Sequence, residues 1–594
     1  MMRIADFLMQ RLHEHGVGHV FTVTGRGSLF LNDALAAHKE IDAVCNHHEQ
    51  AAAYAAVAYA ETKDSLGACM VSTGCASTNA ITGALNAWQD GIPCIFISGQ
   101  NKLKETSRYT GVPIRTYGQQ ETDLIPMVES ITKYAVMITD PKRAVYEIDK
   151  AFHLAQEGRK GPVWIDIPLD VQNMRIRPEE CEQFIPESIE ILKPSKSDIE
   201  YLKNALNEAE RPTVIIGSGV RSADAIQDLE KFVTKYKIPL TYSASSPDTY
   251  GSSNELSIGS VGAMGCSRAA SFAVQNSDLL LVIGCRMSSM TAGEFCKFAR
   301  AARVIVVDID EVEHSKEGVA IDKLILSDAR EFLQTMNEPS EVKQANPEWI
   351  DKCLHWKEVF PNCEEGFKQE KKVDLYHLAE AMSEVFPANG SLVTDSGLIE
   401  VILPPNMKFK PGQRSIHPAS QGSMGSALPS IIGTHFGADR SVVCVVGDGS
   451  IMMNLQELET ISYNKIPAKI FVISNNVYAV IRKRQKDLFG SRTIGTDPEN
   501  GVSCPDFRDV AATFKLNYAK IENAKNLTED LDKVLKMDGP VLCEVMGLED
   551  QRYIHCSYTK NAKRRVVQRP IEDQSPFLDR ELFLSEMIIE PIDQ

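Results

Sequence analysis

The chain has 594 residues, of which 43% are apolar and 24% are charged, and its formal net charge is −17. This length exceeds one ordinary core and the composition is that of a folded globular protein, so we expect three domains of roughly 100–200 residues each. The negative charge excludes nucleic acid as a partner, because a protein that binds phosphate backbones needs a positive field to release counterions.

The cysteines and the N-terminus indicate the compartment. Fourteen cysteines are scattered along the chain, many of them inside apolar stretches such as SVVCVVGDGS, and none forms a CxxC pair. This pattern favours reduced core residues over zinc ligands. The N-terminus, MMRIADFLMQRLHEHGVGHVF, is too polar for a signal peptide, and no run of about 18 apolar residues would span a membrane. We expect a cytoplasmic protein with a small-molecule substrate and no membrane partner.

Short apolar runs recur from one end of the chain to the other. They include HVFTVTG, GACMVSTG and PCIFISGQ in the first third, TVIIGSG, LLLVIGCR and RVIVVDID in the middle, and SLVTDSG, SVVCVVGDG and KIFVISNN in the last third. A strand that is apolar on both faces is buried on both faces, which is typical of a parallel sheet covered by helices. The intervening segments have helical spacing. The sequence therefore predicts an α/β protein built of doubly wound parallel-sheet domains.

Two polar, proline-marked stretches divide this pattern, one at residues 178–198 and one at residues 337–356. The predicted domains are 1–180, 190–340 and 360–560, followed by a C-terminal tail at 561–594.

A glycine-rich turn ends one strand of the last predicted domain. Gly447, Asp448, Gly449 and Ser450 follow the run VVCVV, and Asn475 ends the next strand, 27 residues after Asp448. Free N–H groups of such a turn hold an anion, and a carboxylate with an amide oxygen beside it suits Mg²⁺. On the turn alone a generic glycine turn is the better interpretation. The spacing of one helix plus one strand favours the metal site, because both residues then lie at the same edge of the sheet.

Glu49 is the other candidate. It lies in CNHHEQAAAYAAVAYAE, at the start of an Ala-rich helix that follows the apolar run IDAVC. Taken alone it is an ordinary first-turn carboxylate, which the helix dipole favours.

These motifs together resemble the thiamine-diphosphate-dependent enzyme superfamily, in its acetolactate-synthase-like group. The segments VFTVTGRGSLFLNDAL, HHEQAAAYAAVAYA, NAITGALNAWQDGIPCIFISGQ and the stretch 447–476 match in order over the whole chain. The resemblance implies a pyrimidine-binding domain at 1–180, a central nucleotide-fold domain at 190–340 and a diphosphate-binding domain at 360–560. It also implies thiamine diphosphate and Mg²⁺ as cofactors.

The resemblance assigns roles to individual residues. Asp448 and Asn475 would be metal ligands together with the backbone carbonyl of Val477, although SNNVYAV departs from the family pattern and a shift by one residue would make Asn476 the ligand. Glu49 would hydrogen-bond the aminopyrimidine ring and shift its tautomer, which the cofactor needs to lose its C2 proton. Further cofactor contacts would be Gly25, Ser396, Gly397, Met424, Gly447, Gly449, Ser450 and Tyr478, with Met424 either supporting the bent cofactor or simply packing in the core.

The resemblance also bears on the reaction. Gln120, in GQQETD, would hydrogen-bond the carbonyl of an acceptor substrate, or belongs to a solvated loop. Gln119 stands where acetolactate synthases usually have Phe, and STGCAST places Cys75 where they have a Gly-Pro-Gly turn. Both differences argue against a plain acetolactate synthase.

A narrower resemblance points to an acceptor. HHEQ, YTGVPIRTYGQQE, DPENGVSCPDF and the tail RPIEDQSPFLDRELFLSEMIIEP resemble the acetolactate-synthase-like proteins of lipopolysaccharide and capsule gene clusters, which include a yersiniose-pathway synthase. This implies a carboligase that decarboxylates pyruvate and adds the two-carbon unit to a nucleotide-linked keto-deoxysugar. The basic residues 482–484 and 560–565 would suit the nucleotide diphosphate, or are solvated faces.

Other functions remain open on the sequence. An acetolactate synthase or a simple 2-keto-acid decarboxylase is the alternative enzyme, and an inactive binding homologue is disfavoured because Glu49, Asp448 and Asn475 are all retained. In the resembling family the glutamate and the metal ligand meet across a subunit interface, which implies a homodimer or homotetramer.

The central domain raises a second cofactor. IIGSGV, GCRMS and VVDID resemble the segments that hold FAD in acetolactate synthases, with Gly217 and Gly219 in the turn, Arg286 at the phosphates, and Asp308 or Asp310 near the adenosine. A nucleotide-like domain that holds no flavin is the alternative, since related folds keep the domain without the cofactor.

Overall fold

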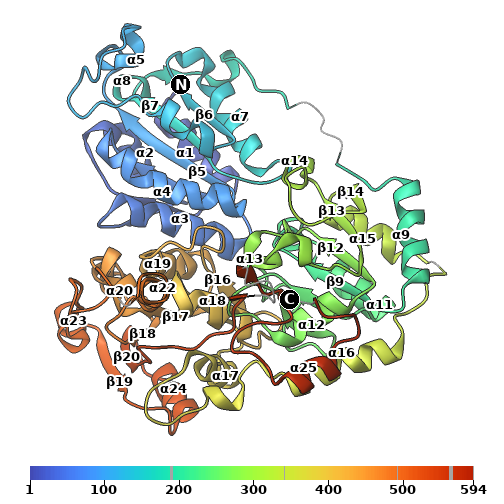
Figure 1. The fold of residues 1–594 in the computed structure, drawn as a ribbon. Helices are drawn as coiled ribbons and strands as arrows, with labels where there is room; N and C mark the ends of the chain where they lie inside the picture. The colour runs from blue at the N-terminus through green and yellow to red at the C-terminus, as the bar shows by residue number, and fades with distance from the viewer. Residues whose placement is uncertain (187–190, 340, 491, 561–565, 593–594) are drawn as a thin grey trace.

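Three six-stranded sheets organise the protein. The computed structural model describes residues 1–186, 191–339, 341–490, 492–560 and 566–592. Every neighbouring pair of strands within the three sheets is parallel, and helices cover both faces of each sheet (Figure 1). The predicted α/β class with three doubly wound domains is confirmed. Within these ranges no helix is both long enough and apolar enough to cross a membrane.

The N-terminal sheet has the order β3-β2-β4-β5-β7-β6. The central strands β4, β5 and β7 are buried at every position, which explains their unbroken apolar runs, whereas the edge strands β3 and β6 are each buried at one position of four. The elements are β2 (His19–Thr22), β3 (Asp42–Cys45), β4 (Gly67–Val71), β5 (Cys94–Gln100), β6 (Tyr134–Met137) and β7 (Val163–Pro168), with α1 (Ile4–Glu14), α2 (Leu29–Ala37), α3 (Glu49–Lys63), α4 (Cys75–Asp90) and α7 (Ala144–Gln156).

The central sheet has the order β11-β10-β9-β12-β13-β14. Its elements are β9 (Pro212–Ile216), β10 (Leu240–Tyr242), β11 (Ser257–Ser260), β12 (Leu279–Ile283), β13 (Arg303–Asp308) and β14 (Lys323–Leu326), with α9 (Lys196–Glu208), α10 (Gly219–Ser222), α11 (Ile226–Tyr236), α12 (Arg268–Asn276), α14 (Glu311–His314) and α15 (Ala329–Asn337). The second predicted break, at 337–356, holds the start of a helix, α16 (Pro347–Val359). Asn346 caps it and Pro347 occupies its first position, where a missing N–H does no harm.

The C-terminal sheet has the order β16-β15-β17-β18-β20-β19. Its elements are β15 (Gly390–Val393), β16 (Arg414–Ile416), β17 (Ser441–Gly447), β18 (Lys469–Ser474), β19 (Asn517–Ile521) and β20 (Val541–Met546), with α17 (Leu375–Val385), α18 (Gly397–Asn406), α19 (Ala427–Gly437), α20 (Asp448–Ile451), η8 (Met452–Asn454), α21 (Glu457–Tyr463), α22 (Ala479–Phe489), α23 (Phe507–Thr513) and α24 (Leu527–Leu535).

Two helices join the first and third domains into one core. The Ala-rich helix α3 is buried on nearly all sides and packs against α4 of its own domain and α19 of the C-terminal domain. The approach is close, because a Cβ at Gly433 would lie 2.0 Å from the carbonyl oxygen of Ala55. Small residues on both helices therefore set the distance between the two domains.

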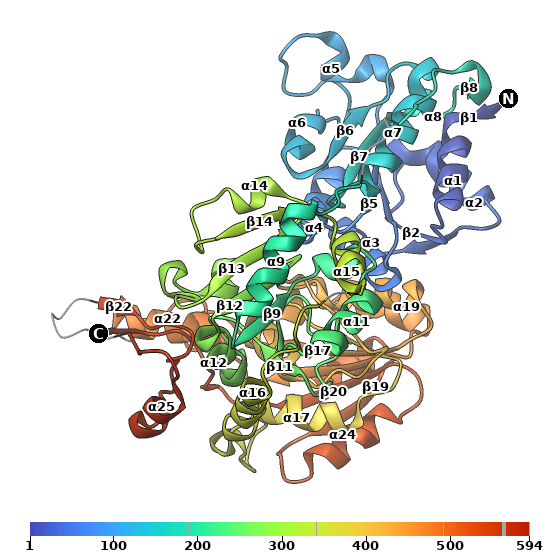
Figure 2. The same ribbon diagram turned by 90° about the vertical axis from the view of Figure 1, so that its right-hand side faces the viewer.

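The C-terminal tail packs on the central domain. Figure 1 shows α25 (Arg580–Glu586) beside α16, and Figure 2 shows α25 on the same side of the molecule as α12. Phe583 joins an aromatic cluster with Phe272 and Trp356, and the Glu586 carboxylate accepts a hydrogen bond from Trp356 Nε1 at 3.0 Å. The tail thus completes the core between α12 and α16.

Candidate active site

A cavity of about 370 Å³ lies at the carboxyl edge of the C-terminal sheet, where β15, β17 and β18 end. Its walls are largely apolar, with contributions from Leu398, Ile399, Val480 and Leu548. Ten of the residues that the sequence predicted as cofactor or metal contacts line this cavity, and Gly25 and Glu49 do not: the ten are Ser396, Gly397, Met424, Gly447, Asp448, Gly449, Ser450, Asn475, Val477 and Tyr478. Ligands of open parallel sheets bind at this edge, so the cavity is the candidate active site.

The glycine turn is shaped by its neighbours. β17 ends at Gly447 and α20 begins at Asp448, so the start of this short helix borders the cavity. A Cβ at Gly449 would lie 1.9 Å from the ring of Tyr478, which packs directly on the turn. A side chain at position 449 would therefore displace Tyr478 from the cavity wall.

Asp448 is held by three backbone groups. Its carboxylate accepts hydrogen bonds from the N–H groups of Gly449 and Asn475, both at 2.8 Å, and Asn476, at 2.5 Å. Burial raises the pKa of Asp448, and the three N–H groups oppose that rise because they stabilise the ionised form. The carboxylate is fixed in position and keeps lone pairs free for a further ligand.

Asp448, Asn475 and Val477 all line the cavity, and they offer a carboxylate, an amide oxygen and a backbone carbonyl, which are oxygen ligands of the kind that Mg²⁺ prefers. The Asn475 amide oxygen also accepts from the Val477 N–H at 3.2 Å. Among the described residues that line the cavity, Asn475 is present and Asn476 is not; the Asn476 amide oxygen accepts from the Cys504 N–H at 3.3 Å. No group of three or more His, Cys, Asp or Glu side chains suited to a metal ion occurs in the described ranges. The residues fit a metal ion that completes its shell with oxygens of a bound diphosphate.

The sequence reading missed Asp395, which supports the turn. Its carboxylate accepts from Ser450 Oγ at 2.5 Å and from the Gly425 N–H at 3.0 Å. Burial raises the pKa of Asp395 to about 6. Its position directly before Ser396, at the end of a strand, was the only signal in the sequence.

Glu49 lies at the carboxyl edge of the N-terminal sheet. It is the first residue of α3, and Asn79 Nδ2 of α4 donates to its carboxylate at 2.9 Å. Gly25 lies at the same edge, close to Ser72. Within the residues described for this chain, neither Glu49 nor Gly25 lines the Asp448 cavity. Glu49 and Gly25 therefore lie apart from the Asp448 cavity within one chain.

The loop predicted to contact the acceptor has two kinds of residue. Gln119 and Gln120 are exposed, and Gln120 has a positive φ of 65°. Glu121, in contrast, is buried and accepts hydrogen bonds from the N–H groups of Ser107 and Tyr117, both at 3.0 Å, so it folds the loop. Cys75 is exposed at the first residue of α4.

The basic run at 482–484 differs from the prediction. Arg482 is buried and donates to Asp550 at 2.9 Å, and Lys483 pairs with Asp487. Only Arg484 has no ion pair among the described residues. The run is thus not a patch of three free cations, because Arg482 is buried and binds Glu549 and Asp550, which follow β20. The second basic run, 560–565, falls almost entirely outside the described residues.

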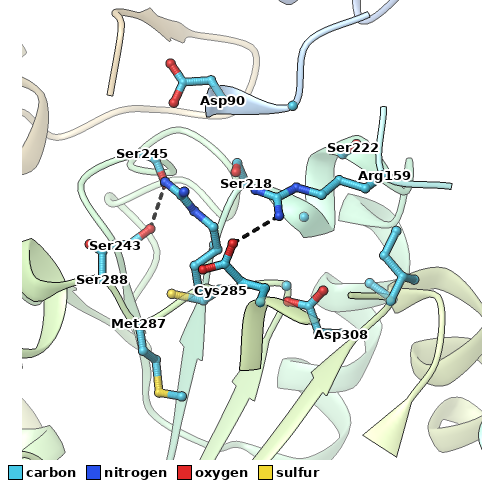
Figure 3. Close-up of a pocket in the computed structure, with 18 of the residues that line it drawn as sticks. Asp90, Arg159, Ser218, Ser222, Ser243, Ser245, Cys285, Met287, Ser288 and Asp308 are labelled. Atoms are coloured by element: carbon cyan, nitrogen blue, oxygen red, sulfur yellow. Dashed lines mark hydrogen bonds and ion pairs between the residues drawn. The ribbon is translucent and has the colours of Figure 1, made fainter. Parts of the chain in front are cut away.

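The four residues predicted to hold a flavin line a second pocket, in the central domain. Gly217, Gly219, Arg286 and Asp308 lie where β9, β12 and β13 end, around a volume of about 160 Å³. Asp90 and Arg159, from the N-terminal domain, also line this pocket, and Figure 3 shows the Arg159 side chain extending beside Ser218 with Asp90 above it. The glycines are needed here, since a Cβ at Gly219 would lie 2.7 Å from the Gly284 Cα.

Charged groups of this second pocket are tied to one another. Arg159 pairs with Asp310 at 2.7 Å and with Glu313 at 3.0 Å, and Asp308 contacts His314 Nε2 at 3.1 Å. Arg286 Nη2 donates to Ser420 Oγ at 2.5 Å. The volume is below the roughly 300–1,000 Å³ of small-molecule pockets. The residue types suit a nucleotide, and an adjoining cavity of about 430 Å³ shares Asp90, Ser218 and Ser245 with this pocket.

Family models match all three domains. They are the N-terminal TPP binding domain of thiamine pyrophosphate enzymes over residues 2–127, the central domain over 199–336 and the C-terminal TPP binding domain over 395–545. Thiamine pyrophosphate is thiamine diphosphate by another name.

Curated proteins similar to this chain cover nearly its whole length. An acetolactate synthase large subunit of Parasynechococcus marenigrum is 31% identical, over 91% of this chain and 87% of that protein. Those of Haemophilus influenzae and Lactococcus lactis are each 28% identical, over 96% and 91% of this chain, respectively.

Proposed function

The chain belongs to the thiamine pyrophosphate enzyme family, in its acetolactate synthase type, and on this premise we propose that it decarboxylates pyruvate and transfers the remaining two-carbon unit to a ketone acceptor. The observation that carries the proposal is the cavity in which Asp448, Asn475 and Val477 meet the glycine turn. Bound thiamine diphosphate supplies a carbon nucleophile for the keto carbon and accepts the charge left when carbon dioxide departs.

The chain's own residues would divide the work. The turn from Gly447 to Ser450 would hold the diphosphate with its N–H groups, and Asp448, Asn475 and the Val477 carbonyl would hold Mg²⁺ beside it. The apolar wall excludes water, which protects a reactive carbon nucleophile from protonation. Glu49 would hydrogen-bond the pyrimidine ring.

We propose that the active form is a homodimer or a homotetramer of such dimers. Its support is the separation of Glu49 from the Asp448 cavity within one chain. Mixing Glu49→Gln subunits with Asp448→Ala subunits should restore about a quarter of the sites, because a mixed symmetric dimer holds one intact pair. Activity in isolated monomers would contradict this arrangement.

The proposed acceptor is a ketone on a nucleotide-linked deoxysugar. Its support is the narrower resemblance to lipopolysaccharide-cluster proteins and the exposed Gln119 in place of the usual aromatic residue. Without an aromatic side chain at position 119, the site would have room for a larger and more polar acceptor. None of the described tail residues lines the Asp448 cavity, because they pack on the central domain.

Product analysis separates this acceptor from the alternatives. With pyruvate alone we expect slow turnover, and with pyruvate plus a keto-deoxysugar nucleotide we expect a branched-chain sugar product. Rapid acetolactate formation that no sugar nucleotide changes would assign the protein to the acetolactate synthases, and acetaldehyde release to the decarboxylases.

The reaction needs no flavin step, because moving a two-carbon unit from a keto acid to a ketone involves no net oxidation. FAD would thus have no redox role in the proposed reaction, and Asp310 and Asp308 of the central domain contact Arg159 and His314, respectively. A cytoplasmic location is part of the proposal, and the fourteen free cysteines support it.

A further inference from the structure

A buried carboxylate of the C-terminal domain reaches across to the turn that carries Glu49. Glu457, the first residue of α21, has no exposed surface. Its carboxylate accepts hydrogen bonds from Asn46 Nδ2 and from the His47 N–H, both at 3.0 Å, and from Thr460 Oγ1 at 2.8 Å. Two of these three donors belong to the N-terminal domain and lie more than 400 residues away in the chain.

The donors fix a specific turn. Asn46 and His47 connect the end of β3 to the start of α3, and Glu49 is the first residue of that helix. On the other side of Glu49, the side-chain oxygen of Gln50 accepts from Asn454 Nδ2 at 3.1 Å. His47 and Gln50 flank Glu49, and both are held by the segment that begins with Asp448.

Because Glu457 is buried, its carboxylate depends on these hydrogen bonds for stabilisation. A carboxylate out of contact with water is strongly unfavourable unless its oxygens are hydrogen-bonded, so the folded state retains all three donors. The Asn46 side chain is itself buried, and its amide oxygen has no hydrogen-bond partner among the described residues. Glu457 is therefore the only described side chain that fixes the Asn46 amide, and through it the turn.

We propose that Glu457 is the positioning residue for Glu49. It holds the turn before α3 so that the Glu49 carboxylate points along one direction, and a displacement of about 1 Å at such a group is enough to slow a reaction by up to about 10²-fold. The inference rests on the role proposed for Glu49. It also links the active sites of the two chains. The segment that holds the Glu49 turn starts at the diphosphate turn of the same chain, whereas Glu49 would serve the cavity of the partner chain.

The test uses three variants in the full-length protein. Glu457→Gln keeps the shape but turns an N–H₂ group toward donors, and Asn46→Ala removes one donor and leaves the carboxylate in place. Glu459→Gln is the matched control, because Glu459 is exposed on the same helix.

Three measurements apply to each variant. The first is amide hydrogen exchange at His47 by mass spectrometry in the cofactor-free protein, which reports release of the turn directly. The second is the Kd of thiamine diphosphate with Mg²⁺ by calorimetry. The third is the rate of C2 hydrogen–deuterium exchange of the bound cofactor, measured by NMR after an acid quench.

For Glu457→Gln and Asn46→Ala we expect faster His47 amide exchange, C2 exchange slowed about tenfold or more, and a Kd within about threefold of the parent. Glu459→Gln should change none of the three. If Glu457→Gln does not fold, Asn46→Ala carries the test alone.

Two outcomes separate the inference from the proposed function. Normal C2 exchange in Glu457→Gln or in Asn46→Ala, with slow exchange in Glu49→Gln, overturns the inference and leaves the proposed function intact. Normal C2 exchange in Glu49→Gln overturns the role proposed for Glu49, whatever the other variants do.

Discussion

Two glycine turns at equivalent places in two domains have different surroundings. Gly217 and Gly219 follow β9, the third strand in the order β11-β10-β9-β12-β13-β14, and Gly447 and Gly449 follow β17, the third strand in the order β16-β15-β17-β18-β20-β19. Both turns lie at the point of the sheet where ligands of doubly wound folds bind. One borders a cavity of about 370 Å³, and the other a pocket of about 160 Å³.

The difference comes from side chains that lie beyond the turns. In the C-terminal domain, Asp448 accepts hydrogen bonds from backbone N–H groups and no cation pairs with it among the described residues, so its charge remains available to a metal. In the central domain the acidic groups are already paired, Asp310 with Arg159 and Asp308 with His314. The same backbone arrangement thus borders acidic groups that, among the described residues, are free of ion pairs in one domain and acidic groups that are bound to neighbouring side chains in the other.

The largest expected effect comes from removing the Asp448 carboxylate. Asp448→Ala should abolish retention of thiamine diphosphate on gel filtration, because the diphosphate would then face the turn without its metal. Retention in the parent should also weaken as the pH falls through the pKa of Asp448, since the protonated carboxyl does not bind a cation. Asp439→Ala, an exposed carboxylate of the same domain, is the control. Unchanged affinity in Asp448→Ala would remove the metal-site assignment.

A smaller effect is expected from changing Glu49. Glu49→Gln should leave cofactor affinity nearly unchanged and lower turnover by about 10²-fold, the scale on which an acid–base group acts. Steady-state kinetics and calorimetry measure the two quantities separately. Glu40→Gln, exposed and just before β3, should behave as the parent does. Equal losses of affinity and turnover would mean that Glu49 only holds the fold.

The smallest effect is expected at the pocket of the central domain. Arg159→Ala removes the pairs with Asp310 and Glu313, and because the Arg159 side chain is 37% exposed, the free energy of unfolding should fall by only about 1 kcal/mol. Thiamine diphosphate affinity should not change. Urea unfolding and calorimetry check both statements. A loss of cofactor retention in this variant would show that the two pockets are coupled. It would contradict the view that only the Asp448 cavity binds the cofactor.

Much of the fold was predictable because it depends on local patterns. Unbroken apolar runs are typical of strands buried on both faces, and the runs at 212–216 and 441–447 both became central strands of parallel sheets. The gathering of Asp448 and Asn475 was also predictable. The carboxyl ends of adjacent parallel strands share one edge, so one helix plus one strand of spacing is enough to place both residues together.

The tertiary structure decided what depends on contacts between distant segments. Whether Arg482 is free depends on Asp550, whether the tail is loose depends on the core between α12 and α16, and what Glu457 does depends on Asn46 and His47. None of these has a sequence period or a fixed spacing, because a hydrogen bond or an ion pair forms wherever the fold brings two side chains together. The sequence by itself determined the strands, the glycine turns and the metal-binding residue types, since these follow from the chemistry of neighbouring residues. The volume of each pocket and the separation of Glu49 from Asp448 were decided only by the packing of the three domains.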